Sequence, residues 1–270
     1  HYVGEGYFLR AHEYFYRLRR LGDFPIVTET LPDEQEALVE ASKRRPRNEV
    51  ARFILSDLDK AIALLTNEPP GGKVRITKNA ALLLKARVAL FEATWEKYHA
   101  GTANVPNGPG WPGAGKDYNA NSTFPSGSLD GEITFFLTEA MDASAQVADA
   151  LSLVNNNKVI RESSSQPKNE YYDMFAAANP GGYAEVIMYR AYDVDLGRAH
   201  FYNHYVYHGA QKGYTHQMEQ SMLMENGLPV YAANSGYAGD YYIKDTKTDR
   251  DWRWRLFMKA PNEVKAFENI

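Results

Sequence analysis

The stretch GEGYFLRAHEYFYRLRRLGDFP, residues 4–25, decides the fold of the N-terminal part of this chain. Phe8, Ala11, Phe15 and Leu18 recur at spacings of three and four, which places them on one stripe of a helix. Gly22 suits the position just after a helix end, and the proline at position 25 prevents continuation. The stretch therefore predicts an amphipathic helix with an architectural role.

Charged side chains follow a second face of this helix. Arg10, Glu13, Arg17 and Arg20 keep helical spacing, which is typical of a solvated or salt-bridged surface. Arg10 stands between Leu9 and an alanine, which favours a partly buried anchor instead. We predict that its aliphatic stem is more than half buried and that its guanidinium pairs with a carboxylate or with backbone carbonyls.

Two further helices are predicted at residues 46–65 and 77–99. The first has its apolar stripe at Val50, Ile54, Leu58, Ile62 and Leu65. The second is rich in alanine, which lets helices approach closely, and Thr77 suits its N-cap. We expect the two to pack antiparallel, as in one unit of a helical solenoid, although the tetratricopeptide consensus is met only loosely.

The character of the chain changes after residue 99. Residues 100–131 form a long Gly/Pro/Asn loop, and a loop of this length is either disordered or functional. A tryptophan framed as GPGWPG favours function, since an exposed indole has little use in a linker. Helices are expected at 132–153 and 170–178, and YAEVIMYRAY (183–192) alternates like a strand.

The domain organisation expected is one domain over 1–270. Within it, residues 1–99 are helical scaffold, 100–131 the long loop, 132–180 further helices and 181–270 a loop-rich ligand-binding region. The fold class is mostly α, a tetratricopeptide-like scaffold with a few short strands.

Composition excludes several functions. A net charge of −4 over 270 residues, with a pI near 6.0, gives no basic face for nucleic acid. The chain has no cysteine, which excludes disulfides and thiolate chemistry. No apolar run reaches the roughly 18 residues that a membrane span needs.

Candidate catalytic and metal sites are weak. His200, His204 and His208 lie four residues apart, but the zinc-hydrolase pattern His-Glu-x-x-His is absent. Asp193 and Asp195 are as typical of a turn as of a glycosidase pair. We therefore predict no catalytic residue, no metal and no cofactor.

Six segments together resemble the SusD/RagB family. Phe8, Leu9, Arg10 and Ala11 followed by Gly22, Asp23 and Pro25 match its first motif. VARFILSDLDKAIALL (50–65) and RITKNAALLLKARVALFEATW (75–95) resemble its next two helices. EVIMYRAY (185–192), MENGLPVY (224–231) and DRDWRWRLFMKAP (249–261) follow in the family order, although Trp252 stands where a proline is common.

The resemblance implies a non-catalytic lipoprotein of the outer membrane that binds glycans at the cell surface. It implies delivery of the glycan to a SusC-like TonB-dependent outer-membrane transporter. Family members are longer, so the sequence is expected to be a piece lacking both ends, including the N-terminal lipid anchor.

Aromatic side chains are the predicted means of binding. Sugars present apolar C–H faces edged by hydroxyls, so their binders use aromatic platforms ringed by polar groups. The predicted platform is Trp111, Tyr118, Tyr192, Tyr202 and Tyr207, with Arg198, Asn203 and His204 as hydrogen-bonding groups. Two alternatives stay open: a helical-repeat adaptor that binds only protein, and a glycoside hydrolase.

Overall fold

The computed structural model describes residues 1–200 and 213–264. Its internal contacts divide the chain into two compact units. Unit 1 comprises His1–Ser152 and Ala184–Tyr189, and unit 2 comprises Leu153–Tyr183 and Arg190–Ile270. The expectation of one domain over 1–270 is not tested by this division and stays a prediction.

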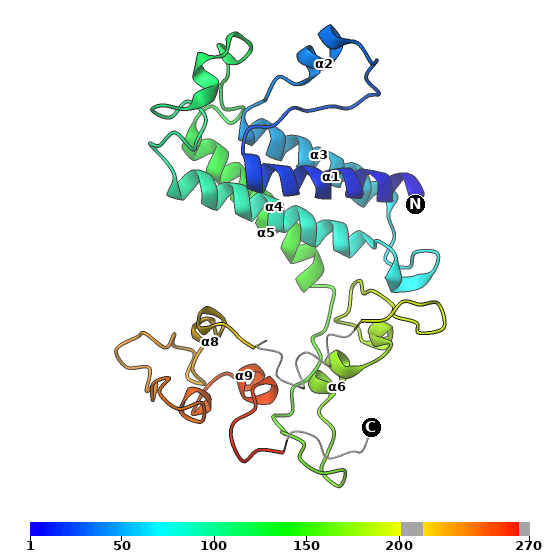
Figure 1. The fold of residues 1–270 in the computed structure, drawn as a ribbon, viewed down its shortest axis with the longest axis vertical. Helices are drawn as coiled ribbons and strands as arrows, with labels where there is room; N and C mark the ends of the chain where they lie inside the picture. Colours follow the sequence, from blue (N-terminus) through cyan, green and yellow to red (C-terminus); the bar gives the residue numbers. More distant parts are fainter. Residues whose placement is uncertain (201–212, 265–270) are drawn as a thin grey trace. The chain divides into compact units, whose positions relative to one another are not determined.

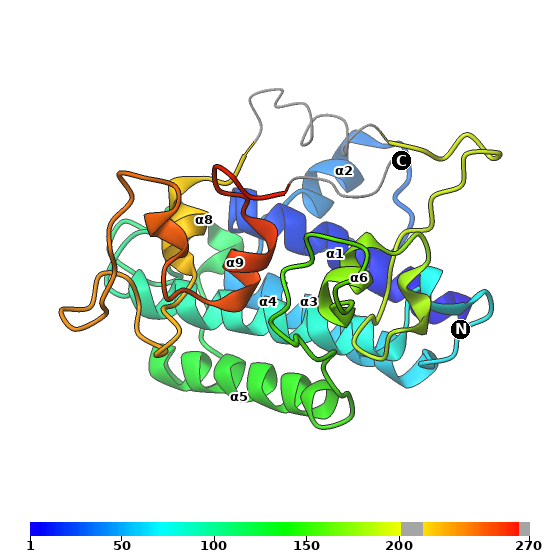
Figure 2. The same cartoon turned by 90° about the horizontal axis from the view of Figure 1, so that it is seen from below.

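Unit 1 is built on a bundle of long helices, shown in Figure 1. They are α1 (Tyr2–Leu21), α3 (Arg47–Leu64), α4 (Lys78–Tyr98) and α5 (Leu129–Ala148). Helix α1 packs on α3, α3 on α4 and α4 on α5, so each long helix is a neighbour of the next long helix along the chain (Figure 2). Each predicted helix forms, and the mostly α fold class is confirmed.

The bundle core contains the predicted apolar stripes. Phe8, Ala11, Phe15 and Leu18 are buried, as are Val50, Ile54, Leu58 and Leu65, while Ile62 is partly buried. Ala81, Ala89 and Ala93 of α4 are fully buried. Burial of such side chains stabilises the bundle by about 1.5–3 kcal/mol for each large residue.

The predicted helix ends are also present. The backbone N–H of Gly22, at φ 67°, donates to the carbonyl of Leu18 and closes α1. The Thr77 hydroxyl caps α4 by accepting from the backbone N–H of Ala80 at 3.1 Å. Local sequence therefore determines where these helices begin and end.

Ion pairs connect successive helices of the bundle. Arg10 of α1 donates to both oxygens of Asp57 on α3, at 2.6 and 2.8 Å. Its side chain is 32% exposed, so the prediction of a largely buried, carboxylate-paired Arg10 is confirmed. Arg47 of α3 binds Glu92 of α4 through two bonds of 2.8 Å.

A third pair joins α3 to α5. Arg52 donates to both oxygens of Glu132, at 2.6 and 2.9 Å. Because Arg47 at the start of α3 pairs with Glu92 near the end of α4, those two helices run antiparallel, as predicted. The outer charges of α1 are solvated: Arg17 and Glu13 form an exposed pair.

Two expectations about secondary structure are wrong. Residues 183–192 form no strand, because the alternating segment finds no partner strand among the described residues; the backbone N–H of Tyr189 donates to the carbonyl of Lys73. Within 1–200 and 213–264 the β-pairing is limited to isolated bridges. Helix α5 ends at Ala148 instead of residue 153, as the chain beyond becomes extended at Leu151.

Short helices complete the described chain. In unit 1, α2 (Gln35–Ala41) projects from the bundle, followed by η1 (Gly72–Val74), η2 (Pro112–Gly115) and η3 (Asp117–Asn119). Unit 2 contains α6 (Glu170–Ala176), η4 (Pro180–Gly182), α8 (His216–Ser221), η5 (Asp245–Lys247) and α9 (Trp252–Phe257). None of the helices in the described chain is both long and apolar enough to cross a membrane.

Arg250 organises the core of unit 2. It is fully buried and donates to the Glu219 carboxylate and to the carbonyls of Glu219, Met222 and Thr246. Its guanidinium also lies 5.1 Å from the ring centroid of Tyr237. A backbone bridge between Met224 and Arg250 joins the motif at 224–231 to the motif at 249–261, so both motifs contribute to the packing of unit 2.

Candidate functional site

The long loop after α4 is ordered by a series of short turns. Backbone N–H groups of Thr102, Val105, Gly108, Trp111 and Ala114 each donate to the carbonyl three residues earlier. This pattern satisfies the loop's polar backbone without a partner strand or helix. Gly108 is required in it, since an added Cβ would lie 2.1 Å from the Thr102 carbonyl oxygen.

Trp111 fixes this loop to the bundle. Its indole is 4% exposed, and its Nε1–H donates to Asp23 Oδ2 at 2.8 Å. Gly113 lies against the ring, where an added Cβ would come within 2.2 Å of Trp111 Cζ2. The expectation of an exposed indole is wrong, because the Gly-rich turns fold the ring inward onto a buried acceptor.

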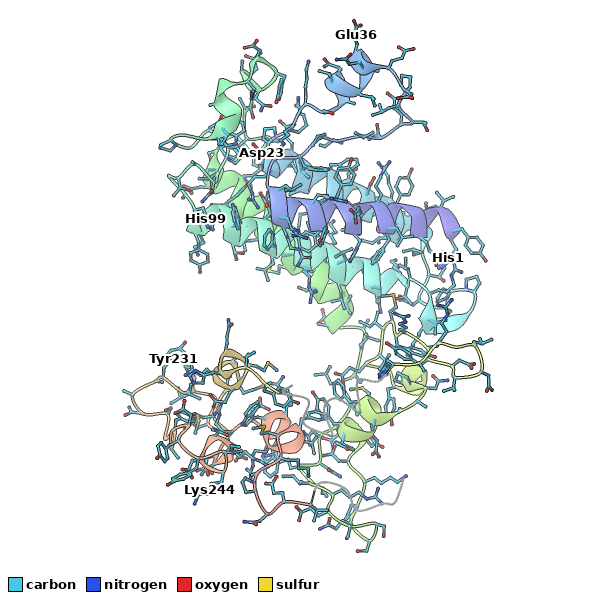
Figure 3. The ribbon with its side chains drawn as sticks, viewed as in Figure 1. His1, Asp23, Glu36, His99, Tyr231 and Lys244 are labelled. Carbon is cyan, nitrogen blue, oxygen red and sulfur yellow. The ribbon has the colours of Figure 1, made fainter. Side chains whose placement is uncertain are left out.

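Asp23 joins three elements at this end of unit 1. Its Oδ1 accepts from the backbone N–H of Arg47 at 2.9 Å, at the start of α3, while Oδ2 accepts from Trp111. Burial raises the pKa of this carboxyl, and the two hydrogen bonds oppose that rise. In Figure 3 Asp23 and His99 lie at the same end of the bundle, opposite His1.

A cavity of about 620 Å³ opens beside this junction. Its aromatic lining comes from Trp95, Trp111 and Tyr118, the last a half-buried ring in η3. The rest of its lining is mainly cationic, amide and small side chains: Leu18, Arg19, Arg20, Leu21, Gly22, Asp23, Ser42, Arg44, Arg47, Ala103, Asn104, Pro112, Gly113, Lys116 and Asn119. We take this cavity as the candidate site.

Asn119, which lines the cavity, has a buried side-chain oxygen that accepts no hydrogen bond from the described residues. Its side chain is 5% exposed, and its Nδ2 donates to the carbonyls of Arg44 and Gly113 at 3.4 Å each. Its Oδ1 is buried and accepts no hydrogen bond from the residues that the structure describes. A buried acceptor left in this state costs about 1–3 kcal/mol of stability.

The Trp95 ring already contacts two other side chains. The guanidinium of Arg47 lies 4.2 Å from its ring centroid, and the His99 imidazole stacks at 4.1 Å. Its Nε1–H donates to the carbonyl of Asn104. Tyr118 has one such contact, the Lys43 ammonium 5.7 Å from its ring centroid, so of the aromatic rings lining the cavity we take it as the one that contacts a ligand.

The predicted site residues divide into three groups. Trp111 and Tyr118 lie together in the cavity. Tyr192 and Arg198 lie together in a turn of unit 2, which the backbone pairing of Asp193 with Arg198 closes, and both are exposed. Tyr202, Asn203, His204 and Tyr207 lie outside the described residues, as does His208.

The Tyr192 turn has its own aromatic and cationic contacts. The Tyr192 ring lies 4.4 Å from the ring of His200, nearly perpendicular to it, and 5.3 Å from the Arg190 guanidinium. Its role in binding, and that of Arg198, stay predictions.

Sequence reasoning missed most of the cavity lining. Asn119, Arg44 and Lys116 carry no pattern of their own, because only the tertiary turns bring them beside Tyr118. Arg20 belongs to the charged face predicted for the first helix, whereas Arg19 lies over the ring of Phe15; the signal available for both is their position in the last turn of that helix.

In the described chain, no group of three or more His, Asp or Glu residues is placed to hold a metal ion. Glu132 is committed to the bundle: burial raises its pKa, but bonds from Arg52, Ser126 and Asn48 outweigh this and hold the pKa below its usual value.

Comparisons with known proteins identify the fold. Residues 1–90 match the family model SusD-like_3, described as starch-binding associating with outer membrane. A SusD-like protein from Bacteroides fragilis is 20% identical with a TM-score of 0.51, covering 94% of this chain and 42% of its own. A SusD-like carbohydrate binding protein from the same organism is 16% identical with a TM-score of 0.50, covering 92% and 38%.

The chain thus spans less than half the length of these two structures. No curated protein matches it. The resemblance to the SusD/RagB family is confirmed by the family model and by the fold.

Proposed function

We propose, starting from a SusD-like N-terminal third and a SusD-like fold over most of the chain, that this protein binds glycans without transforming them. The binding site is the cavity beside Trp111 in unit 1. The family description, starch-binding associating with outer membrane, supports glycan as the ligand class.

The observation that carries the proposal is the lining of this cavity, which combines the half-buried Tyr118 ring with exposed polar side chains such as Asn104 and Lys116. Polar side chains of this kind hydrogen-bond sugar hydroxyls, and the Tyr118 ring offers a flat apolar surface to the C–H face of the same sugar. A volume of about 620 Å³ suits a few sugar units, since small-ligand sites span roughly 300–1,000 Å³.

The carboxylates of the cavity favour binding over hydrolysis. A glycosidase places two carboxyl groups about 5–9.5 Å apart across the bond that it cleaves. Asp23 is the one acidic residue among those lining the cavity, and its two oxygens already accept from Arg47 and Trp111. The cavity therefore lacks a free acid and base.

The family description supports a location at the outer membrane. We propose a surface-exposed, lipid-anchored protein of the outer membrane, which passes its glycan to a SusC-like TonB-dependent transporter. In this arrangement the predicted Tyr202, Asn203, His204 and Tyr207, together with Tyr192 and Arg198, form further contacts to a longer glycan.

Affinity gel electrophoresis against a panel of polysaccharides, with a reducing-sugar assay on the same panel, tests the proposal. We expect retention by at least one glycan and no release of reducing ends. Tyr118→Ala should weaken the retained interaction roughly tenfold, equivalent to about 1.4 kcal/mol.

Tyr98→Ala is the matched control, because Tyr98 is a 76% exposed tyrosine of unit 1 that does not line the cavity. Equal loss in both variants, or none in either, would place the glycan elsewhere. A protein that no glycan retains would instead fit the adaptor alternative, and released reducing ends would establish a hydrolase.

A further inference from the structure

We infer that the cavity selects acidic glycans, namely oligosaccharides that carry carboxylate or sulfate groups. This inference rests on the proposed function, because it names the ligand class of the same cavity. Five lining residues are cationic, namely Arg19, Arg20, Arg44, Arg47 and Lys116, and one, Asp23, is acidic. The whole chain carries a charge of −4, so composition does not account for this concentration.

Arg47 is the one lining cation that the protein itself neutralises. It is 4% exposed and forms two hydrogen bonds of 2.8 Å with the buried Glu92. Its side chain therefore belongs to the bundle, and four cations remain for the cavity.

These four cations are exposed and lack carboxylate partners in the described chain. Arg19 lies over the ring of Phe15 at 4.8 Å, and Arg20 donates to the hydroxyl of Tyr16. Both partners are neutral, so neither charge is cancelled. Arg44 and Lys116 have no side-chain hydrogen bond within the described residues, and Asp23 feels the charge of Arg44.

Elsewhere in unit 1 the cations are of both kinds. Arg10, Arg45, Arg52, Arg75 and Lys85 each form an ion pair with a carboxylate, whereas Arg87 and Lys97 of α4 are exposed and have no ion pair in the described chain, but neither lines the cavity. Exposed charges of one sign held around one hollow focus the potential there and attract an anion.

The geometry suits acidic sugars. A guanidinium presents two parallel N–H donors, which match the oxygens of a carboxylate or sulfate, while an ammonium acts as a point charge. Tyr118 supplies a ring contact that a sugar uses and that a simple anion does not. The cavity thus combines recognition of a sugar with recognition of its acidic substituent.

Titration calorimetry with two matched pairs of ligands tests this inference. One pair is hexagalacturonate and its methyl ester; the other is a carrageenan hexasaccharide and its desulfated form. In at least one pair, the acidic member should bind at least tenfold more tightly than its neutral partner at about 50 mM salt. That preference should shrink as salt rises, because salt screens exposed charges.

The double variant Arg44→Gln/Lys116→Gln should lose most of the preference for the acidic member. Arg44→Lys/Lys116→Arg should keep it, because the charges remain. Arg87→Gln/Lys97→Gln makes the same change of charge at two exposed positions of α4 outside the cavity, and should leave the preference intact.

Each outcome separates the inference from the proposed function. Equal binding of acidic and neutral partners, or tighter binding of neutral glycans across the panel, overturns the charge inference and leaves glycan binding in place. Binding of a thymidine decanucleotide as tight as that of the acidic sugar shows unselective attraction, which also overturns it. If no glycan binds, both proposals fall.

Discussion

Glu96 is predicted to make the stability of unit 1 depend on pH. Its side chain is fully buried, and neither carboxyl oxygen has a hydrogen-bond partner in the described chain. Burial first, and then the charges of Glu92 and Glu132, raise the pKa to about 9 against the opposing effect of Arg47 and Arg52. At neutral pH the native protein therefore holds Glu96 protonated.

The sign of the effect follows from the two states. An unfolded Glu96 has its ordinary pKa of 4.5, so between pH 4.5 and about 9 the native chain retains a proton that the unfolded chain has released. The free energy of unfolding then falls as pH rises, by up to about 1.4 kcal/mol per pH unit. Between pH 5.5 and 7.5 this residue alone should lower it by about 2–3 kcal/mol.

Glu96→Gln removes the titration and keeps the shape of the side chain. Urea unfolding followed by far-UV circular dichroism reports mainly on unit 1, because the long helices lie there. The difference in unfolding free energy between the variant and the wild type should shift in favour of the variant by about 2–3 kcal/mol over this pH range. Other titrating groups are common to both proteins and cancel in the difference.

Glu36→Gln, at an exposed position of α2, is the control and should follow the wild type at each pH. If Glu96→Gln and the wild type gave parallel profiles between pH 5.5 and 7.5, the assignment of a protonated, buried Glu96 would be refuted.

Three further predictions concern the bundle and its loop. Arg10→Ala should lower the free energy of unfolding by about 2–4 kcal/mol, because the buried Asp57 loses both guanidinium hydrogen bonds and keeps the longer 3.6 Å contact to Lys60. Glycan binding by the folded protein should not change; full stability with lost binding would contradict this role. Gly113→Ala should displace Trp111 and shift its fluorescence, since the new Cβ has no room, whereas Gly115→Ala meets nothing within 4 Å and should behave as wild type. Trp111→Phe should lower the free energy of unfolding by about 1–3 kcal/mol, because Asp23 loses a hydrogen-bond donor. An unchanged urea midpoint would show that the Trp111–Asp23 hydrogen bond does not contribute to stability.

The helices could be predicted because their signals are local. The stripe from Phe8 to Leu18 and the cap at Thr77 depend on spacing within one element, and both form as expected. Even Arg10 was placed correctly, since its apolar neighbours in sequence already indicate a buried stem.

Features that depend on distant partners were not predictable. Trp111 was expected at the surface, because nothing in GPGWPG indicates an acceptor at Asp23, 88 residues earlier. The segment 183–192 alternates like a strand, but a strand forms only where another strand is available. The charge of the cavity has the same origin, because whether Arg44 is paired depends on which carboxylates the fold brings near.

The loop between residues 99 and 122 is a series of short turns, each closed by its own backbone hydrogen bond. The buried side chains of Trp111 and Asn119 fix this run of turns by hydrogen bonds to Asp23 and to the carbonyl of Arg44, whereas the turn at Pro109 and Gly110 is exposed. Such turns can change in length or composition without disturbing helix packing, since surface loops tolerate insertion at small cost. The composition of these exposed turns can therefore change while the packing of the helices beneath them is kept.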